Sequence, residues 1–270
     1  MNHQRVLRAA YLDLDGTLVG HGGSLFRDGE GGFTMLGARA LEACARAEVE
    51  VVPYSGRRQS TMLHTARLLG VASYIFEAGS GLVLDGEVEW LTDGLEPRDD
   101  ETIHDQIEAS GAPALLLERY AGRLSRYEPW RLGPREISML FLGEGIASAE
   151  ADELLDAHGF EWLRLVENGV MHGVAGTGLA YQLIPRASSK PRAVARHMQA
   201  RGYAAEECIA VGDSREDLGA AEVVGTFWLE ANATPEVRAA ATAYPNVRFA
   251  DAGWGAGVYE AVVTTLAEGR

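Results

Sequence analysis

The beginning of the chain shows a pattern in which short apolar runs alternate with segments of helical periodicity. Apolar runs over 6–14, 48–54 and 73–76 predict buried strands. Apolar residues at helical spacing predict helices over 37–47 and 59–69. Strands without a polar face that alternate with helices are typical of a parallel sheet covered on both sides.

The same pattern resumes near residue 187. Strands are expected over 207–211 and 223–229, and helices over 189–201, 216–221, 235–243 and 255–267. The two ends of the chain therefore predict one α/β fold, a Rossmann-like core with a parallel sheet.

The middle of the chain departs from this pattern. Residues 81–90 alternate between apolar and polar positions, as in an exposed hairpin strand. Strands are then expected over 137–142, 162–167 and 179–184, and helices over 99–110, 114–126 and 148–158. Antiparallel strands with helices on one face suit this section. The sequence thus predicts a discontinuous core of residues 1–81 and 187–270, interrupted by an inserted α+β cap of residues 82–186.

Composition and charge narrow the choice of partners. The chain has 270 residues and a formal net charge of −15, which repels nucleic acid phosphates and anionic membranes, so we expect neither as a partner. No apolar stretch approaches the ~20 residues of a membrane-spanning helix, and residues 1–14 are too polar for a signal peptide. We therefore expect a cytoplasmic protein, monomeric or homodimeric, in which any phosphate site has its own local positive charge.

Polar side chains follow three of the expected core strands or precede one of them. Ligands of open parallel sheets bind beyond the carboxyl ends of the strands, so we expect these side chains to converge in one crevice. They are, in chain order, the side chains of Asp13 and Asp15, then those of Ser55 and Arg57, between which Gly56 lies, then Lys190, and finally Asp213 and Asp217.

Clustered carboxylates with one lysine favour phosphoryl transfer. Like charges in one crevice repel each other unless a cation neutralises them, and oxygen-rich sites suit Mg²⁺, which also contacts substrate phosphate. A carboxylate such as that of Asp13 can attack phosphorus and form an aspartyl-phosphate, and Asp15 can then protonate the leaving oxygen and activate water. Ser55, Lys190 and backbone N–H groups can hold the phosphoryl oxygens.

The order of these residues also resembles a known family. Residues Asp13-Leu14-Asp15-Gly16-Thr17-Leu18 resemble the first motif of the haloacid dehalogenase-like phosphatase superfamily. Ser55 resembles its second motif, Lys190 its third, and the segment 212–217 its fourth. The long insertion between the second and third motifs resembles the large-cap subclass, which includes Cof-type and sugar-phosphate phosphatases.

The resemblance implies a role for each motif residue. Asp13 would be the nucleophile and Asp15 the acid/base, while Ser55, the adjacent Gly56 and Lys190 would bind the phosphoryl group. The Asp13 carboxylate, the Asp15 main-chain carbonyl and Asp213 would hold Mg²⁺, with support from Asp217. Two positions depart from the pattern: Glu216 stands where the Cof-type fourth motif has Asn, and residues 77–79 read Glu-Ala-Gly where relatives often have Asn-Gly.

Simpler interpretations remain open for two motif residues and for the substrate contacts. Asp217 could only cap its short helix, and Ser55 could cap the helix at 59–69. Arg57 could contact the substrate or merely flank its turn. Arg126 lies among arginines and aromatic residues for which a solvated helix face is the favoured interpretation, and His172 lies near an expected cap turn.

We therefore expect a Mg²⁺-dependent phosphatase that acts on a small phosphorylated metabolite, a sugar or polyol phosphate. One alternative is a phosphosugar mutase, which would pass the phosphoryl group to a second sugar hydroxyl. Another is a non-catalytic protein that binds a phosphometabolite. The presence of Asp15 argues against the second alternative, since a binding protein needs no acid/base.

Overall fold

A computed structural model of the chain describes residues 6–127, 136–173 and 176–269. Its central sheet is parallel throughout, as the two ends of the sequence predict, and has the order β12-β11-β10-β1-β2. The final strand, β12, falls in a segment for which the sequence predicted no strand. The bounds are Ala9–Leu12 for β1, Glu50–Pro53 for β2, Cys208–Gly212 for β10, Thr226–Leu229 for β11 and Val247–Phe249 for β12.

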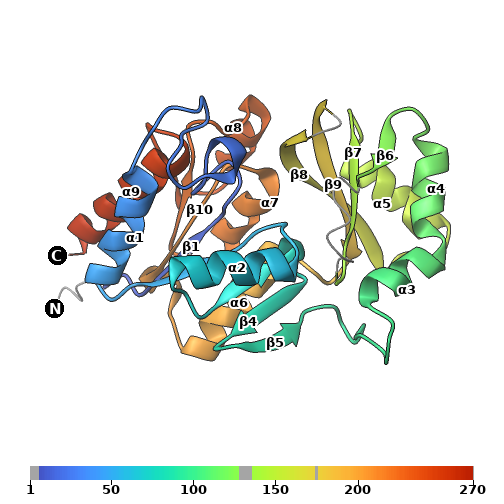
Figure 1. Cartoon of the computed structure of the whole chain (residues 1–270), viewed down its shortest axis with the longest axis horizontal. Coiled ribbons are helices and arrows are strands. Elements are labelled where there is room, and N and C mark those ends of the chain that lie inside the picture. Colours follow the sequence, from blue (N-terminus) through green and yellow to red (C-terminus); the bar gives the residue numbers. More distant parts are fainter. Residues whose placement is uncertain (1–5, 128–135, 174–175, 270) are drawn as a thin grey trace.

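Helices cover both faces of this sheet (Figure 1). Ala10 and Leu12 of β1 belong to the core cluster that includes α1 and α9, whereas Ala9 and Tyr11 belong to the one that includes α6 and α8. Because alternate residues of a strand point to opposite faces, β1 is apolar throughout. The helices are α1 Leu36–Arg46, α6 Lys190–Arg201, α7 Arg215–Leu218, α8 Pro235–Ala241 and α9 Trp254–Glu268.

A small antiparallel sheet adjoins the core. It has the order β3-β4-β5, with β3 at Tyr74–Phe76, β4 at Gly81–Leu84 and β5 at Glu87–Trp90. Tyr54, just after β2, forms a parallel bridge with Ile75 of β3, and helix α2 Gln59–Leu69 connects the two strands. The alternating segment 81–90 therefore pairs with β3.

The inserted section contains a four-stranded antiparallel sheet of order β6-β7-β9-β8, with helices α3, α4 and α5 on the side away from the core (Figure 1). Tyr181 and Leu183 of β9 are buried in the same apolar cluster as Leu116 and Leu155 of these helices. The bounds are α3 Ile103–Ser110, α4 Ala112–Arg119, β6 Leu124–Arg126, β7 Met139–Gly143, α5 Ser148–Ala157, β8 Leu163–Gly173 and β9 Gly176–Pro185.

One predicted helix in this section is wrong. Residues 114–126 were expected to be one helix, but α4 ends at Arg119 and Arg126 lies in β6. The reason is Gly122, whose φ of +79° is left-handed and cannot continue a right-handed helix. Arg126 therefore lies on a strand, where it pairs with Phe141 of β7.

None of the helices in the described parts of the chain is both long and apolar enough to cross a bilayer.

Candidate active site

A cleft of about 1270 Å³ lies between the carboxyl ends of the core strands and the inner face of the cap sheet. Its core side includes most of the polar residues that follow the core strands. Its cap side includes residues from β6 to β9. The core contributes Asp13, Asp15, Ser55, Gly56, Arg57, Lys190, Asp213 and Asp217, and the cap contributes Arg126, Leu140, Asn168, Ala180 and Gln182.

The strand order explains why Asp13 and Asp213 meet. Strand β1 pairs directly with β10, with Leu12 opposite Val211, so the residues that follow the two strands lie side by side. The backbone of Gly16 has a φ of +92°, and a Cβ there would lie 2.6 Å from Oδ2 of Asp213. Only glycine combines this conformation with such a close approach.

Lys190 lies between two carboxylates at the bottom of the cleft. Its Nζ donates to Oδ1 of Asp13 at 2.8 Å and to Oδ1 of Asp217 at 2.5 Å, and its side chain is 1% exposed. Burial lowers the pKa of Lys190, but the charges of Asp13 and Asp217 outweigh burial and raise the pKa above its ordinary value. Lys190 is therefore a fixed positive charge inside the acidic cluster.

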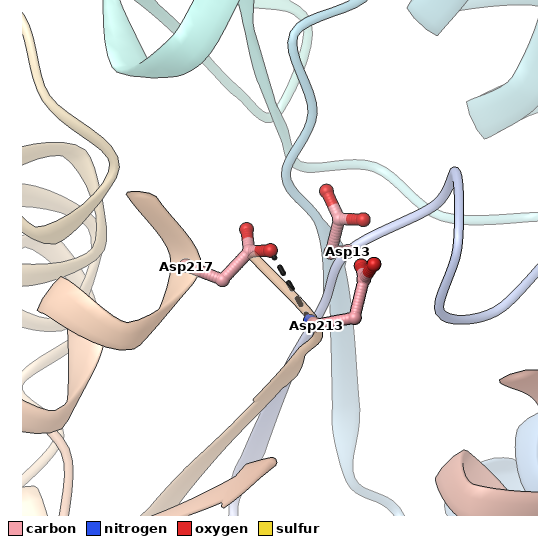
Figure 2. A group of neighbouring side chains, drawn as sticks. All are labelled: Asp13, Asp213 and Asp217. Atoms are coloured by element: carbon pink, nitrogen blue, oxygen red, sulfur yellow. Dashed lines mark hydrogen bonds between the residues drawn. The ribbon is translucent and has the colours of Figure 1, made fainter. Parts of the chain in front are cut away.

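Asp13, Asp213 and Asp217 each offer an oxygen within 4.8 Å of the others (Figure 2). Burial and the charge of Asp217 raise the pKa of Asp13 well above its ordinary value, opposed by Lys190. Burial and Asp217 also raise the pKa of Asp213 to about 7. Two buried carboxylates and the partly exposed one of Asp213 thus face a single lysine, and this set of oxygens fits a hard divalent cation.

Asp217 caps its short helix, as one of the two interpretations of the sequence expects, and it also contacts Lys190. Its Oδ2 accepts hydrogen bonds from the backbone N–H and the hydroxyl of Ser214, so it caps α7. Its Oδ1 simultaneously accepts from Lys190. The cap on the short helix therefore fixes the carboxylate against the lysine.

The Asp15 side chain lies apart from the three clustered carboxylates and is 58% exposed. Both of its oxygens are held by Arg57, at 2.7 Å from Nε and 2.6 Å from Nη2. Burial lowers the pKa of Arg57, whereas the hydrogen bonds and charge of Asp15 raise it above its ordinary value. Arg57 therefore joins the expected acid/base to the loop after β2.

The loop after β2 also contacts the cap. Ser55 is buried, and its hydroxyl accepts from the backbone N–H of Arg57, while the residue that caps α2 is Arg58. Ser55 is therefore not the helix cap. The carbonyl oxygen of the next residue, Gly56, accepts from Nε2 of Gln182 at 2.7 Å.

The two expected cap contacts differ. Arg126 lines the cleft, and its guanidinium forms two hydrogen bonds of 2.6 Å with Glu108 on α3. The backbone of His172 lies in β8, whereas its side chain falls outside the described residues.

Glu77 is a functional candidate whose part the sequence did not reveal. It is fully buried, and its carboxylate accepts from the backbone N–H groups of Glu136, Ile137 and Ser138 and from the Ser138 hydroxyl. Its own backbone N–H donates to the carbonyl of Arg57. Glu77 thereby joins the loop after β2 to the segment that enters β7. The only signal in the sequence was its place where relatives have Asn-Gly.

Glu230, at the end of β11, is fully buried, and neither carboxylate oxygen has a hydrogen-bond partner within the described parts of the chain. Burial, followed by the charge of Asp213, raises its pKa well above the ordinary 4.5. Because the folded-state pKa exceeds the unfolded value, Glu230 costs stability progressively as the pH rises above 4.5.

Glu230→Gln is therefore expected to increase the free energy of unfolding at pH 8, by about 1–3 kcal/mol, and to have a smaller effect at pH 5. Urea unfolding at the two pH values measures this difference. The exposed Glu206→Gln is the matched control and should change stability little at either pH. An equal effect of Glu230→Gln at pH 5 and pH 8 would contradict the prediction.

Comparisons with known proteins agree with this fold. No family model matches the chain. The chain is 28% identical over 231 residues, which are 85% of its length and 87% of the relative, to a phosphoglycolate phosphatase from Halorubrum lacusprofundi.

Similar solved structures cover nearly the whole chain. A sucrose-phosphatase from a Synechocystis species matches with a TM-score of 0.65 and 16% identity, covering 97% of this chain and 98% of that one. A phosphatase of the haloalkanoate enzyme superfamily from Bacteroides thetaiotaomicron matches with a TM-score of 0.67 and 15% identity, covering 98% and 97%. A haloacid dehalogenase-like hydrolase from B. subtilis matches with a TM-score of 0.62 and 17% identity, covering 95% and 99%.

At identities this low, the similar solved structures show that the fold is shared and nothing more. The phosphatase relative adds a likeness in sequence, and the four motifs lie together in one cleft. In fold, in motifs and in its phosphatase relative, the chain is similar to haloacid dehalogenase-like hydrolases with a large inserted cap.

Proposed function

We propose that the protein hydrolyses a small phosphate monoester, a sugar or polyol phosphate, with Mg²⁺ and through an aspartyl-phosphate on Asp13. The observation that carries this proposal is the buried arrangement in which Lys190 contacts Asp13 and Asp217, with Asp213 beside them. A purely structural cluster would have no reason to face a cleft of this size. The phosphatase relative supports the choice of a phosphate ester.

Each residue has a defined part in the proposed reaction. A carboxylate oxygen of Asp13 attacks phosphorus, and the bond between phosphorus and the leaving oxygen breaks. Asp15 donates its proton to that oxygen. It then accepts a proton from a water molecule that attacks the phosphorus of the aspartyl-phosphate, which releases inorganic phosphate and restores Asp13.

Local positive charge allows an anionic substrate to enter a protein of net charge −15. Lys190 offsets the carboxylates at the bottom of the cleft, and Arg57 lies at its side. The Ser55 hydroxyl lines the cleft and would bind a phosphoryl oxygen. In the structure Arg57 is bound to Asp15, so an incoming phosphate competes with Asp15 for the guanidinium and frees the acid/base.

The residues present fit a magnesium ion. Three carboxylates with one lysine leave excess negative charge, and the oxygens within 4.8 Å of each other provide hard ligands. Asp13 and Asp213 would hold the ion directly, with the Asp15 main-chain carbonyl, and Asp217 would support them. Bound there, Mg²⁺ would neutralise the carboxylates and polarise the phosphoryl group.

The proposal is tested by measuring phosphate release from p-nitrophenyl phosphate and from a panel of sugar and polyol phosphates, with Mg²⁺ and with EDTA. We expect turnover that EDTA abolishes and that added Mg²⁺ restores. Product analysis by phosphorus NMR separates the alternatives. Isomerised sugar phosphate instead of free phosphate would indicate a mutase, and tight binding without turnover would indicate a binding protein.

Magnesium affinity is expected to depend on pH. Since Asp213 has a pKa raised to about 7 by burial and by Asp217, protons compete with the metal below that pH. The dissociation constant should rise by up to about tenfold for each pH unit below 7, as Asp213 takes up its proton. Magnesium titrations followed by thermal shift at pH 6, 7 and 8 measure this, and equal affinities at pH 6 and pH 8 would contradict it.

A further inference from the structure

Gln182 is a polar side chain on an otherwise apolar part of the cap. Leu140 on β7 and Val166 on β8 pair with it, and Ala180 and Ile184 lie two residues away on the same face of β9. Gln182 is 1% exposed, yet it lines the cleft together with the catalytic candidates. An amide buried among aliphatic side chains needs partners for both of its ends.

Only one end of this amide has a partner. Nε2 donates to the carbonyl oxygen of Gly56 at 2.7 Å, and because a carbonyl can only accept, the orientation of the amide is fixed. Oε1 is therefore the other end of the amide, and it also lies close to Gly56. It accepts no hydrogen bond from any residue in the described ranges, although it is shielded from solvent.

Oε1 of Gln182 lies near the loop after β2, which is expected to bind the phosphoryl group. Gly56 directly follows Ser55, and a Cβ built on Gly56 would lie 3.1 Å from Oε1 of Gln182 and 1.9 Å from Nδ2 of Asn168. Asn168 lies at the irregularity in the pairing of β8 with β9, between Glu167 and Val170. Two cap amides thus approach the loop that is expected to bind the phosphoryl group.

We propose that Gln182 determines specificity: its Nε2 holds the cap on Gly56, and its Oε1 accepts a hydrogen bond from a substrate hydroxyl beside the phosphate ester. This inference rests on the proposed phosphatase function and narrows its substrate class. An amide oxygen accepts only, so the substrate must bring a donor. Phosphate esters of polyols and other hydroxylated compounds meet this requirement, and simple alkyl or aryl phosphates do not.

The test compares glycerol 3-phosphate with propyl phosphate, which has the same carbon chain and no hydroxyl. The wild-type protein is expected to prefer glycerol 3-phosphate by about tenfold or more in kcat/KM, as one lost hydrogen bond in a dry site predicts. Gln182→Met should remove most of this preference. Loss of the Nε2 contact with Gly56 should slow the turnover of both esters by a common factor, and loss of Oε1 should slow that of glycerol 3-phosphate further, so the ratio of the two kcat/KM values is the readout. Methionine fits the aliphatic neighbours, which limits any packing defect.

The exposed Gln199→Met on α6 is the matched control and should leave the ratio of the two substrates unchanged. Equal losses on both substrates would give Gln182 only the structural task of holding the cap and would overturn the inference. An unchanged preference in Gln182→Met would overturn it as well. Wild-type protein that hydrolyses neither ester would instead reject the proposed function, and the inference with it.

Discussion

Asp13→Asn is expected to lower phosphate release on the order of 10³-fold or more while leaving the protein folded. The amide has the shape of the carboxylate but cannot attack phosphorus. Its oxygen can still accept from Lys190, so the buried contact at 2.8 Å has a replacement. Because burial and Asp217 raise the pKa of Asp13, a neutral side chain at this position should not reduce stability at neutral pH.

Single-turnover measurements on the wild-type protein and on Asp13→Asn test this prediction directly. Wild-type protein quenched in acid should retain phosphate bound to the chain, and the variant should retain none. The exposed Asp251→Asn is the matched control and should behave as the wild type. Activity in Asp13→Asn above about one per cent of wild type would mean that phosphorus is attacked by another group or directly by water.

The core of this protein could be predicted from the sequence because its information is local. Strands β1 and β10 are short apolar runs, and each is followed by a polar residue that lines the cleft, Asp13 and Asp213 respectively. The rule that ligands bind beyond the carboxyl ends of parallel strands then brings the residues together. The pairing of Leu12 with Val211 shows the physical basis, since adjacent strands place their following residues side by side.

The contacts between cap and core could not be predicted in this way. Gln182 meets Gly56 and Glu77 meets Ser138 only because two sheets pack together, and no periodicity records such long-range pairs. The segment 81–90 has the alternation of a hairpin, but alternation does not name its partner, which is β3. Gly122 was a local signal that a helical interpretation of 114–126 overlooked.

One signal for the site was available in the composition. Lys190 is the only lysine among the 24 Lys and Arg residues of the chain. Every other residue of this group is arginine, and the one compact ammonium group lies between Asp13 and Asp217. The use of lysine at this position alone indicates that the site needs a compact ammonium group, which the larger guanidinium of arginine cannot replace.

Lys190→Met should therefore have a large effect on both activity and stability. Removing the ammonium leaves Asp13 and Asp217 buried without their shared partner, and breaking a buried ion pair from one side costs about 3–5 kcal/mol. Phosphate release should fall on the order of 10²-fold or more, because the phosphoryl oxygens lose a fixed positive charge. Urea unfolding at pH 8 without metal measures the stability term.

The pH dependence distinguishes this cause from a general packing defect. In the variant the two carboxylates must take up protons to remain buried, so their folded-state pKa values lie above those of the unfolded chain. Carboxylates of this kind lose stability as the pH rises, and the deficit relative to wild type should be largest at pH 8 and shrink toward pH 5. A packing defect would lower the free energy of unfolding by the same amount at pH 5 and at pH 8.

Arg192→Met is the matched control, two residues along the same helix. Arg192 forms an exposed ion pair with Asp93 at 2.6 Å, and its loss should cost about 0–1 kcal/mol. Magnesium should restore part of the stability of Lys190→Met, because a cation can replace the missing positive charge among the three carboxylates. A Lys190→Met protein as stable as Arg192→Met at pH 8 would show that the ammonium group gives the two carboxylates no net stabilisation. The charge balance on which the site is built would then be wrong.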